Sequence, residues 1–240
     1  LQQSSAASDV YKRQLIYMSK DKLVVIGNSV TIRVRPEDSS LNYANIVANK
    51  LKFELIHLGE GALLLEEFSK QQKHQKIPKN SHVIINFGIV DACTRPIPKS
   101  LYNFMMETDK SSFKQTRRLI RFMENKFRTK LVKLKGKKSW TDRNKFIQQM
   151  NNLIDILKSK NCSYSIIGIN YPNNRIESVL PGSQENVILF NKELEKLNNY
   201  ISVHDLNDQE YYPDGIHYNS KGHQLITDKI INHYVLTNSN

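Results

Sequence analysis

Apolar residues recur along this chain in two alternating patterns. Short, continuous runs rich in valine and isoleucine predict five buried strands, at residues 22–26, 53–57, 82–87, 164–169 and 200–203. Apolar positions at helical spacing predict five helices, at residues 41–51, 62–72, 141–159, 185–199 and 219–235. Because strands alternate with helices, we expect a parallel sheet with right-handed crossovers and helices on both faces. The predicted fold is a single-domain, three-layer α/β/α sandwich.

Residues 94–140 interrupt this alternation, between the third strand and the helix for which Thr141 is the expected N-cap. The segment is basic and only partly helical in pattern, so we predict an insertion after the third strand. Its last residue, Trp140, is expected to pack the insertion onto the core, with ligand contact as the alternative. A chain of 240 residues, 39% of them hydrophobic, suffices for one well-packed domain, which we place at residues 18–240.

The N-terminal end differs in character from the rest of the chain. Residues 4–14 resemble a translated sequencing adapter, and they have neither the apolar region nor the cleavage site of a signal peptide. We therefore predict that residues 1–17 are a non-native or disordered leader and that Met18 is the native start. Without an export signal, and with two cysteines in no disulfide or metal-ligand spacing, the protein is expected to be cytoplasmic. No apolar run reaches the roughly 18 residues that a membrane span needs.

The net charge of +12 is concentrated in one segment. Between Arg117 and Lys145 lie twelve basic residues and two acidic ones, Glu124 and Asp142, so ten of the excess positive charges are there. Such a segment attracts polyanions or anionic membrane surfaces, so contact with an anionic surface is one interpretation. A solvated helical face is the other. The pattern indicates no specific nucleic-acid site.

Two short motifs at opposite ends of the domain carry candidate chemistry. The first strand stops in Gly27-Asn28-Ser29, which places a serine on the turn after the strand. Near the C-terminus, Asp214 stands three residues before His217. A histidine held in one tautomer by a carboxylate activates a serine hydroxyl for attack on an acyl carbonyl. We therefore predict Ser29 as nucleophile, His217 as general base and Asp214 as its partner.

Both motifs fit one edge of the predicted sheet. In open parallel sheets, ligands bind outside the carboxyl ends of the strands. The residues that follow predicted strand ends include Ser29, Gly59, Gly61, Gly88, Asn170 and Asp205. The sequence therefore predicts that the site assembles at this edge.

These motifs resemble the SGNH (GDSL-like) hydrolase family, which is named for four short blocks. Residues 27–31 are similar to the first block, 57–61 to the glycine block, 87–91 to the third block and 214–217 to the last. The resemblance covers about residues 22–235. It implies a flavodoxin-like sheet in the order 2-1-3-4-5 and a serine hydrolase.

An oxyanion formed in such a reaction needs preorganised N–H donors. We predict the backbone N–H groups of Ser29 and of Gly61 or Gly59, because glycine lets the main chain come close. The resemblance implies a side-chain donor from an asparagine in the third block, where this chain has Val90 instead. The expected substitutes for that donor are Asn170, past the fourth strand, and Asn28.

Candidate substrate contacts are Asn28, Asp91 and Arg95. The planar guanidinium of Arg95 suits a carboxylate or phosphate, with a local ion pair to Asp91 as the alternative. Arg33 and Arg35 follow the serine closely and are further candidates. The remaining histidines lack metal-ligand spacing, so we expect neither a metal nor a cofactor.

Three functions are open at this point. The first is a serine esterase or deacylase that acts through an acyl-enzyme, and the resemblance favours an O-acetylated carbohydrate or another small ester as substrate. The second is a carbohydrate O-acetyltransferase with the same Ser29–His217 pair. The third is a non-catalytic polyanion-binding or scaffold protein on a decayed hydrolase fold, which Val90 and the basic segment would explain. The sequence does not determine the oligomeric state.

Overall fold

A five-stranded parallel sheet forms the centre of the molecule. The computed structural model describes residues 21–106, 113–206 and 209–238, and the predicted leader at residues 1–17 lies outside them. The strands are β1 (Lys22–Gly27), β2 (Glu54–His57), β3 (His82–Asn86), β4 (Ser163–Ile167) and β5 (Tyr200–Ile201). Their order is β2-β1-β3-β4-β5, and every neighbouring pair is parallel. The predicted α/β class and strand order are therefore confirmed.

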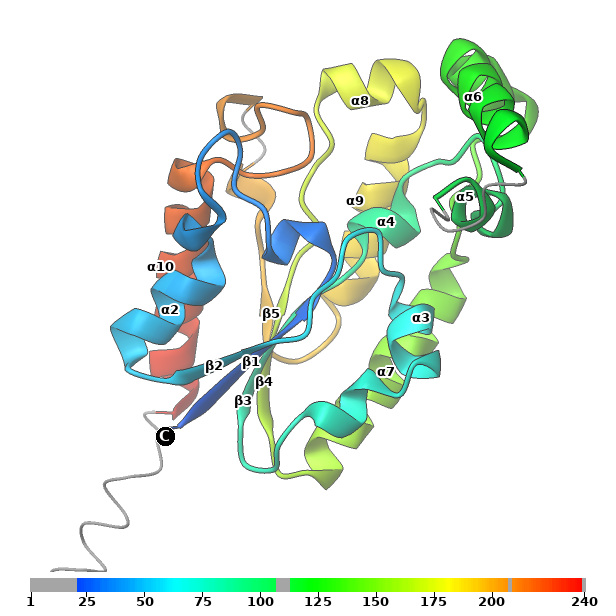
Figure 1. Ribbon diagram of the computed structural model, residues 1–240. Helices are drawn as coiled ribbons and strands as arrows, with labels where there is room; N and C mark the ends of the chain where they lie inside the picture. Colours follow the sequence, from blue (N-terminus) through cyan, green and yellow to red (C-terminus); the bar gives the residue numbers. More distant parts are fainter. Residues whose placement is uncertain (1–20, 107–112, 207–208, 239–240) are drawn as a thin grey trace, which may run out of the picture.

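Helices cover both faces of the sheet, as predicted (Figure 1). On one face, α2 (Tyr43–Leu51) packs beside α10 (Ser220–Asn238). On the other face lie α3 (Leu65–Lys70), α7 (Arg143–Ser159) and α9 (Ser183–Leu194), with α7 in contact with both of its neighbours. This three-layer arrangement follows from right-handed crossovers between parallel strands.

The core lies along the two central strands. Residues 23–26 of β1 and 83–85 of β3 are completely buried, because helices cover the sheet on both sides. A strand buried on both faces has no polar alternation, which is why its sequence is a continuous apolar run. Burying one such side chain contributes about 1.5–3 kcal/mol to folding. The edge strand β2 is less buried, and β5 is shorter than predicted.

Several element ends differ from the predicted ones for local reasons. The predicted helix at residues 62–72 starts only at Leu65, because Ala62 has a left-handed φ of 57°. The N-cap of α7 is Asp142 and not Thr141, since the Asp142 carboxylate accepts the N–H groups of Asn144 and Lys145. Thr141 instead points into the protein and donates its hydroxyl to Asp91.

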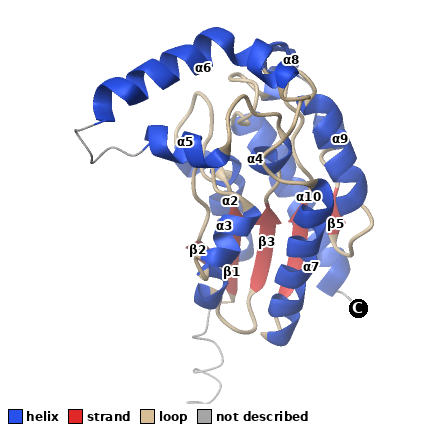
Figure 2. Ribbon diagram, turned by 90° about the vertical axis from the view of Figure 1, so that its right-hand side faces the viewer, coloured by secondary structure: helices blue, strands red, loops and turns tan. Residues whose placement is uncertain are grey.

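The described part of the segment after β3 carries three helices, α4 (Ile89–Ala92), α5 (Lys99–Met106) and α6 (Lys114–Leu134). Thr94 and Ser139 form an isolated antiparallel bridge where this segment leaves and rejoins the main fold. Together with α8 (Asn174–Val179), α5 and α6 lie above the carboxyl ends of the strands (Figure 2). Trp140 packs against the core, and its indole N–H donates to the carbonyl of Ile97 at 2.8 Å. The insertion therefore forms a wall over the edge where the site was predicted.

None of the helices in the described parts of the chain combines the length and the hydrophobicity that a membrane span requires. Cys93 and Cys162 are both buried and unpaired. The predicted cytoplasmic location stays a prediction.

Candidate active site

Ser29 stands at the carboxyl end of β1, where the chain turns sharply. A side chain at Gly27 would overlap with the carbonyl oxygen of Asn86 on β3, so only glycine fits there. The next residue, Asn28, is the N-cap of a short 3₁₀ helix, η1 (Ser29–Thr31), and its side chain accepts the N–H of Val30 at 3.2 Å. The turn therefore holds Ser29 at the first position of a rigid 3₁₀ turn, with its side chain only partly covered.

His217 lies on a loop before α10 that is held by its own aspartate. Oδ1 of Asp214 accepts the backbone N–H groups of Ile216 at 3.0 Å and of His217 at 2.8 Å. Gly215, between Asp214 and Ile216, has a φ of +95°, a conformation that glycine adopts without strain. The side-chain amide of Asn170 donates to the carbonyl of Ile216 at 2.5 Å, which ties the loop to the end of β4.

The fold joins these two distant motifs into one hydrogen-bonded chain. Nδ1 of His217 lies 2.7 Å from Oδ2 of Asp214, and its Nε2 lies 2.9 Å from Oγ of Ser29. With the ring proton on Nδ1, the imidazole donates to the carboxylate and accepts from the serine hydroxyl. The His217 side chain is only 12% exposed, so water competes little for these contacts. Such an arrangement can activate a hydroxyl as a nucleophile.

Asp214 is held in its ionised form. Partial burial acts to raise its pKa, but hydrogen bonds from the His217 side chain and from the backbone of His217 and Ile216 outweigh burial. The pKa of Asp214 is therefore well below its ordinary value. Arg35 adds a more distant positive charge, with Nε 3.6 Å from Oδ2 of Asp214. A negative charge at this position holds the ring of His217 in one orientation, with Nδ1 toward the carboxylate.

A cavity of about 410 Å³ opens directly on Ser29 and His217. Its other lining residues are Arg33, Gly61, Ala62, Ile89, Val90, Arg95, Tyr102, Met106, Trp140 and Ile216. Two of these are arginines, and none of the described lining residues is acidic. The cavity is therefore positively charged as well as partly apolar.

Two of the predicted oxyanion donors are free. Among the hydrogen bonds of the described residues, the backbone N–H groups of Ser29 and Gly61 have no acceptor. The N–H of Gly59 donates to Nδ1 of His57 at 3.2 Å, and Gly59 does not line the cavity. Asn170 does not line it either, because its amide holds the loop at Ile216. The geometry therefore favours Ser29 and Gly61 over Gly59 and Asn170 as donors to an oxyanion.

Two of the predicted substrate contacts are buried inside the protein. Asn28 and Asp91 are both completely buried, and neither lines the cavity. The Asp91 carboxyl accepts the hydroxyl of Thr141 at 2.8 Å, and burial raises its pKa to about 7. Both residues shape the turns around the site, and the geometry does not favour them as substrate contacts.

Arg95, the third predicted contact, does reach the cavity. Its guanidinium carbon lies 4.3 Å from the centre of the Trp140 ring, a cation–π geometry. Its Nη2 donates to the carbonyl of Val90 at 3.3 Å, and the nearby Asp91 carboxyl interacts with it through charge, with no hydrogen bond between the two among the described residues. Nε of Arg95 is buried without a hydrogen-bond partner. Arg95 thus brings a guanidinium to the cavity wall, where it can bind an anionic group.

The sequence patterns did not identify the apolar part of the wall. Tyr102 and Met106 on α5, together with Trp140 and Ile216, line this cavity and also a neighbouring one of about 330 Å³. The neighbouring cavity lies between α5, α6 and α8 and is mostly apolar. The only sequence feature that indicated a contribution of α5 to the cavity wall was the position of the insertion after β3. A segment that follows β3 must start at the carboxyl edge of the sheet.

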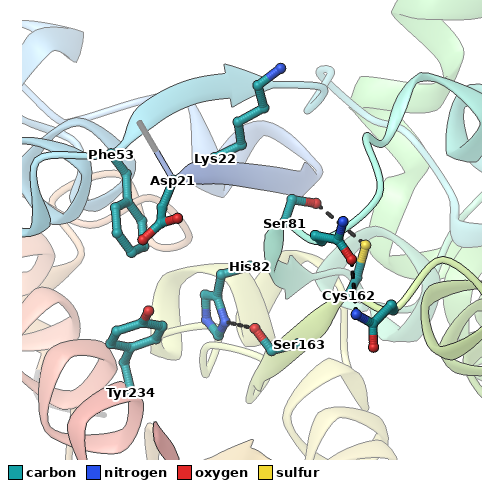
Figure 3. A pocket seen from close by; sticks show the side chains of 10 residues that line it. Asp21, Lys22, Phe53, Ser81, His82, Cys162, Ser163 and Tyr234 are labelled. Atoms are coloured by element: carbon teal, nitrogen blue, oxygen red, sulfur yellow. Dashed lines mark hydrogen bonds between the residues drawn. The ribbon is translucent and has the colours of Figure 1, made fainter. Parts of the chain in front are cut away.

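A cavity at the opposite end of the sheet has no comparable chemistry. It has a volume of about 420 Å³ and lies at the amino ends of β1, β3 and β4. Figure 3 shows His82 at its centre, with Nδ1 2.8 Å from the hydroxyl of Ser163. Burial lowers the pKa of His82 to about 4, so the ring is neutral and structural. Within the described residues, no group of three or more His, Cys, Asp or Glu side chains is arranged to hold a metal.

The fold and the site together define a class of protein. A parallel α/β/α sandwich with a hydroxyl, an imidazole and a carboxylate in series at the carboxyl edge of the sheet is the architecture of a serine hydrolase. Comparison with known proteins leads to the same class.

The family model of the GDSL-like lipase/acylhydrolases matches residues 23–230. The chain therefore belongs to the GDSL-like lipase/acylhydrolase family, and it is a serine-type carboxylic ester hydrolase. The expected resemblance is thus confirmed. No curated protein sequence matches the chain.

Solved structures share this fold at low sequence identity. A lipolytic protein of the G-D-S-L family from Veillonella parvula is 13% identical with a TM-score of 0.56, covering 88% of this chain and 96% of its own. A lipase/acylhydrolase from Enterococcus faecalis is 16% identical with a TM-score of 0.55, covering 88% and 94%. An acetylxylan esterase from Geobacillus stearothermophilus is 14% identical with a TM-score of 0.56, covering 90% and 94%. At such identities the likeness shows the fold alone.

Proposed function

We propose that this protein is a serine esterase that removes acyl groups, with O-acetyl groups on a carbohydrate as the substrate class, through an acyl-enzyme at Ser29. The observation that carries the proposal is the hydrogen-bonded series from Ser29 through His217 to Asp214. A serine hydroxyl is a weak nucleophile by itself. It becomes effective when a base accepts its proton as the bond to the carbonyl carbon forms.

The acyl-enzyme forms and breaks down in two related steps. Oγ of Ser29 attacks the ester carbonyl while its proton passes to Nε2 of His217. The tetrahedral intermediate collapses, the alkoxide of the alcohol leaves, and it takes that proton from the imidazolium. A water molecule then attacks the acyl-enzyme while His217 accepts its proton. The second tetrahedral intermediate collapses, Oγ of Ser29 takes that proton back from the imidazolium, and the acid is released. Asp214 stays ionised throughout and stabilises the imidazolium that forms in each step.

The developing oxyanion is stabilised by backbone groups in this proposal. The free N–H groups of Ser29 and Gly61 border the same cavity as the hydroxyl of Ser29. Each preorganised donor of this kind contributes roughly a hundredfold or more to the rate. Asn170 acts instead through position, since its amide holds the carbonyl next to His217.

Several features support a carbohydrate ester. The lining combines aromatic rings with hydrogen-bonding arginines, which suits a ring-shaped, polar alcohol. Structures of similar fold include proteins described as acetylxylan esterases. Arg33 and Arg95 add the prospect of an acidic carbohydrate, because the described residues that line the cavity with them include no acidic one.

Esters that carry a carboxylate should depend on Arg95. We expect Arg95→Gln to raise KM for such an ester about 10- to 100-fold, because a charge-assisted hydrogen bond is lost. Hydrolysis of the neutral ester p-nitrophenyl acetate should change less than about threefold. The measurement is a pair of kinetic series on an acetylated uronic acid and on the neutral ester.

Arg95→Lys is the matched control, since it keeps the positive charge and loses the planar pair of donors. We expect an intermediate KM for the acidic ester. An equal loss on both esters would show that Arg95 supports the site only structurally and would count against an anionic substrate.

A fluorophosphonate probe tests the proposed function directly. We expect the probe to label Ser29 and no other serine, with the adduct located by mass spectrometry of tryptic peptides. An activated serine reacts with such a probe because it mimics the tetrahedral intermediate. Wild-type protein that hydrolyses no acetyl ester and takes up no probe would contradict the proposal.

A product assay separates hydrolysis from transfer. Acetyl ester is supplied with and without a free sugar acceptor, and products are followed as acetate and as acetylated sugar. Acetate alone supports the esterase. Acetylated sugar as the main product would identify the acyltransferase that shares the Ser29–His217 pair.

A further inference from the structure

Helix α6 exposes a row of apolar side chains near the candidate active site. Leu119, Phe122 and Met123 are 61%, 56% and 46% exposed. They lie within two turns on one side of the helix, because residues three and four apart share a face. Large apolar side chains exposed together on a helix mark an interaction surface.

The same side of α6 continues into a row of lysines. Lys126, Lys130 and Lys133 are exposed and lie at i, i+4 and i+7 from one another, so they form one stripe. We define the outer face of α6 as Leu119, Phe122, Met123, Lys126, Lys130 and Lys133. The face thus has an apolar part toward the N-terminus of the helix and a basic part toward its C-terminus.

Among the residues that the structure describes, no acidic side chain pairs with the lysines of this face. The single acidic residue of α6, Glu124, makes two hydrogen bonds of 2.7 and 2.9 Å with Arg128 and is therefore already paired. Among the described residues, Lys130 and Lys133 have no ion-pair partner. The ammonium of Lys126 lies 5.5 Å from the centre of the Phe122 ring. The positive charge of the outer face is consequently directed toward solvent.

The inner side of the helix is already in use. Arg117 and Val132 are buried against the protein, and Arg121, Glu124 and Arg128 line the apolar cavity beside the catalytic one. The packing of α6 onto the fold therefore does not need the outer face, and the outer face is available for a partner.

We propose that the outer face of α6 binds the surface of an anionic lipid bilayer. Lysines alone would fit any polyanion, but a polysaccharide or nucleic acid offers no apolar phase for Leu119, Phe122 and Met123. A bilayer offers both, since basic residues contact anionic headgroups while apolar side chains enter the boundary between headgroups and acyl chains. The helix lies in the plane of the surface and does not cross it.

This docking orients the catalytic edge of the protein. Helices α5, α6 and α8 form the end of the molecule at the carboxyl ends of the strands (Figure 2). Binding through α6 would hold this end, and with it the cavity at Ser29, close to the lipid surface. An ester carried by a membrane-anchored molecule would then meet Ser29 at a raised local concentration.

Vesicle sedimentation tests the proposal independently of the esterase activity. We expect the protein to bind vesicles that contain phosphatidylglycerol, to bind vesicles of phosphatidylcholine at least about tenfold more weakly, and to be released by about 0.5 M salt. The triple variant Lys126→Gln, Lys130→Gln, Lys133→Gln should bind about a hundredfold more weakly, because each basic residue near an anionic surface contributes about a factor of five. Leu119→Ser with Phe122→Ser should cost at least about tenfold.

Matched controls come from the far end of the molecule. Lys76, Lys79 and Lys158 are exposed at the amino ends of the strands, so replacing all three with glutamine removes equal charge and should leave binding within about twofold. Ile188→Ser, on α9, is the control for lost apolar exposure. Circular dichroism and hydrolysis of p-nitrophenyl acetate verify that each variant is folded.

Three results would overturn the proposal. One is a wild-type protein that does not bind phosphatidylglycerol vesicles. Another is vesicle binding that falls equally in the α6 variants and in the far-end controls. That result would indicate that the net charge of the protein attracts the vesicles through no particular face. The third is a dimer in lipid-free sedimentation velocity that Phe122→Ser dissociates, which would assign the face to a second copy of the chain.

Discussion

Alanine in place of Ser29 should lower kcat for ester hydrolysis by about a millionfold, the loss seen when one member of a serine–histidine unit is removed. The nucleophile is then gone, and His217 has no hydroxyl to deprotonate. The free N–H groups and the cavity remain, so a residual rate above that in water should persist. KM should change little, because the hydroxyl of Ser29 contributes to the chemical step more than to ground-state binding.

Initial rates on p-nitrophenyl acetate and on an acetylated sugar measure this loss. Ser40→Ala is the control, since Ser40 is an exposed serine on a nearby 3₁₀ turn and should keep full activity. A Ser29→Ala protein that retains more than about a tenth of the wild-type rate, after purification free of other esterases, would mean that another group is the nucleophile.

Asparagine in place of Asp214 should lower kcat by about ten-thousandfold while the fold persists. The amide oxygen can still accept the N–H groups of Ile216 and His217, as Oδ1 does now. The amide NH₂ would face Nδ1 of His217, so the ring would carry its proton on Nε2. That tautomer cannot accept a proton from Ser29, and the imidazolium would also lose its negative partner.

Thermal melting and kcat measured together separate these effects. The Asp214→Asn melting temperature should stay close to that of the wild type, whereas the rate falls. Arg35→Gln is the matched control, because Arg35 is 46% exposed and reaches Asp214 only at 3.6 Å; an exposed ion pair of this kind contributes about 1 kcal/mol or less. A rate for Asp214→Asn within tenfold of the wild type would show that the carboxylate does not orient His217.

The central sheet was predictable because its signal is local. The apolar runs that became β1 and β3 are buried on both faces, and such runs have few other stable environments. The amphipathic stripe of α7 was equally clear, yet its N-cap was misplaced by one residue. Thr141 and Asp142 are both good caps by type, and only the buried partner Asp91 decides that Thr141 turns inward.

The insertion was less predictable for a different reason. Its charged and apolar residues fit several helical registers, and the pattern did not show that α5 would lend Tyr102 and Met106 to the cavity wall. Packing of α6 against α5 and α8 decides this arrangement. A segment whose apolar residues are divided between an inner and an outer face has no single periodicity that reveals either.

The candidate oxyanion donors show most clearly what the sequence predicts and what only the neighbours in space decide. Glycine after β2 was a sound expectation, and Gly61 lines the cavity, but the N–H of Gly59 is taken by His57. Asparagine after β4 was also a sound expectation, but the amide of Asn170 is held by the carbonyl of Ile216. The residue type shows which hydrogen bonds a group is able to donate. Only its neighbours in space determine which acceptor it uses.

The order of residues by itself predicted the buried strands and the short motifs that contain Ser29, Asp214 and His217, because buried runs and short motifs depend on contacts within a few residues. The strand order was implied by the resemblance to the SGNH family. Tertiary structure alone decided which hydrogen-bond donors stay free, that Asn28 and Asp91 are buried, and which side of α6 faces solvent. Those properties depend on residues far apart in the chain. The contact between Ser29 and His217 does so too, since 188 positions separate them. Their meeting follows from a parallel sheet that brings the carboxyl ends of its strands to one edge.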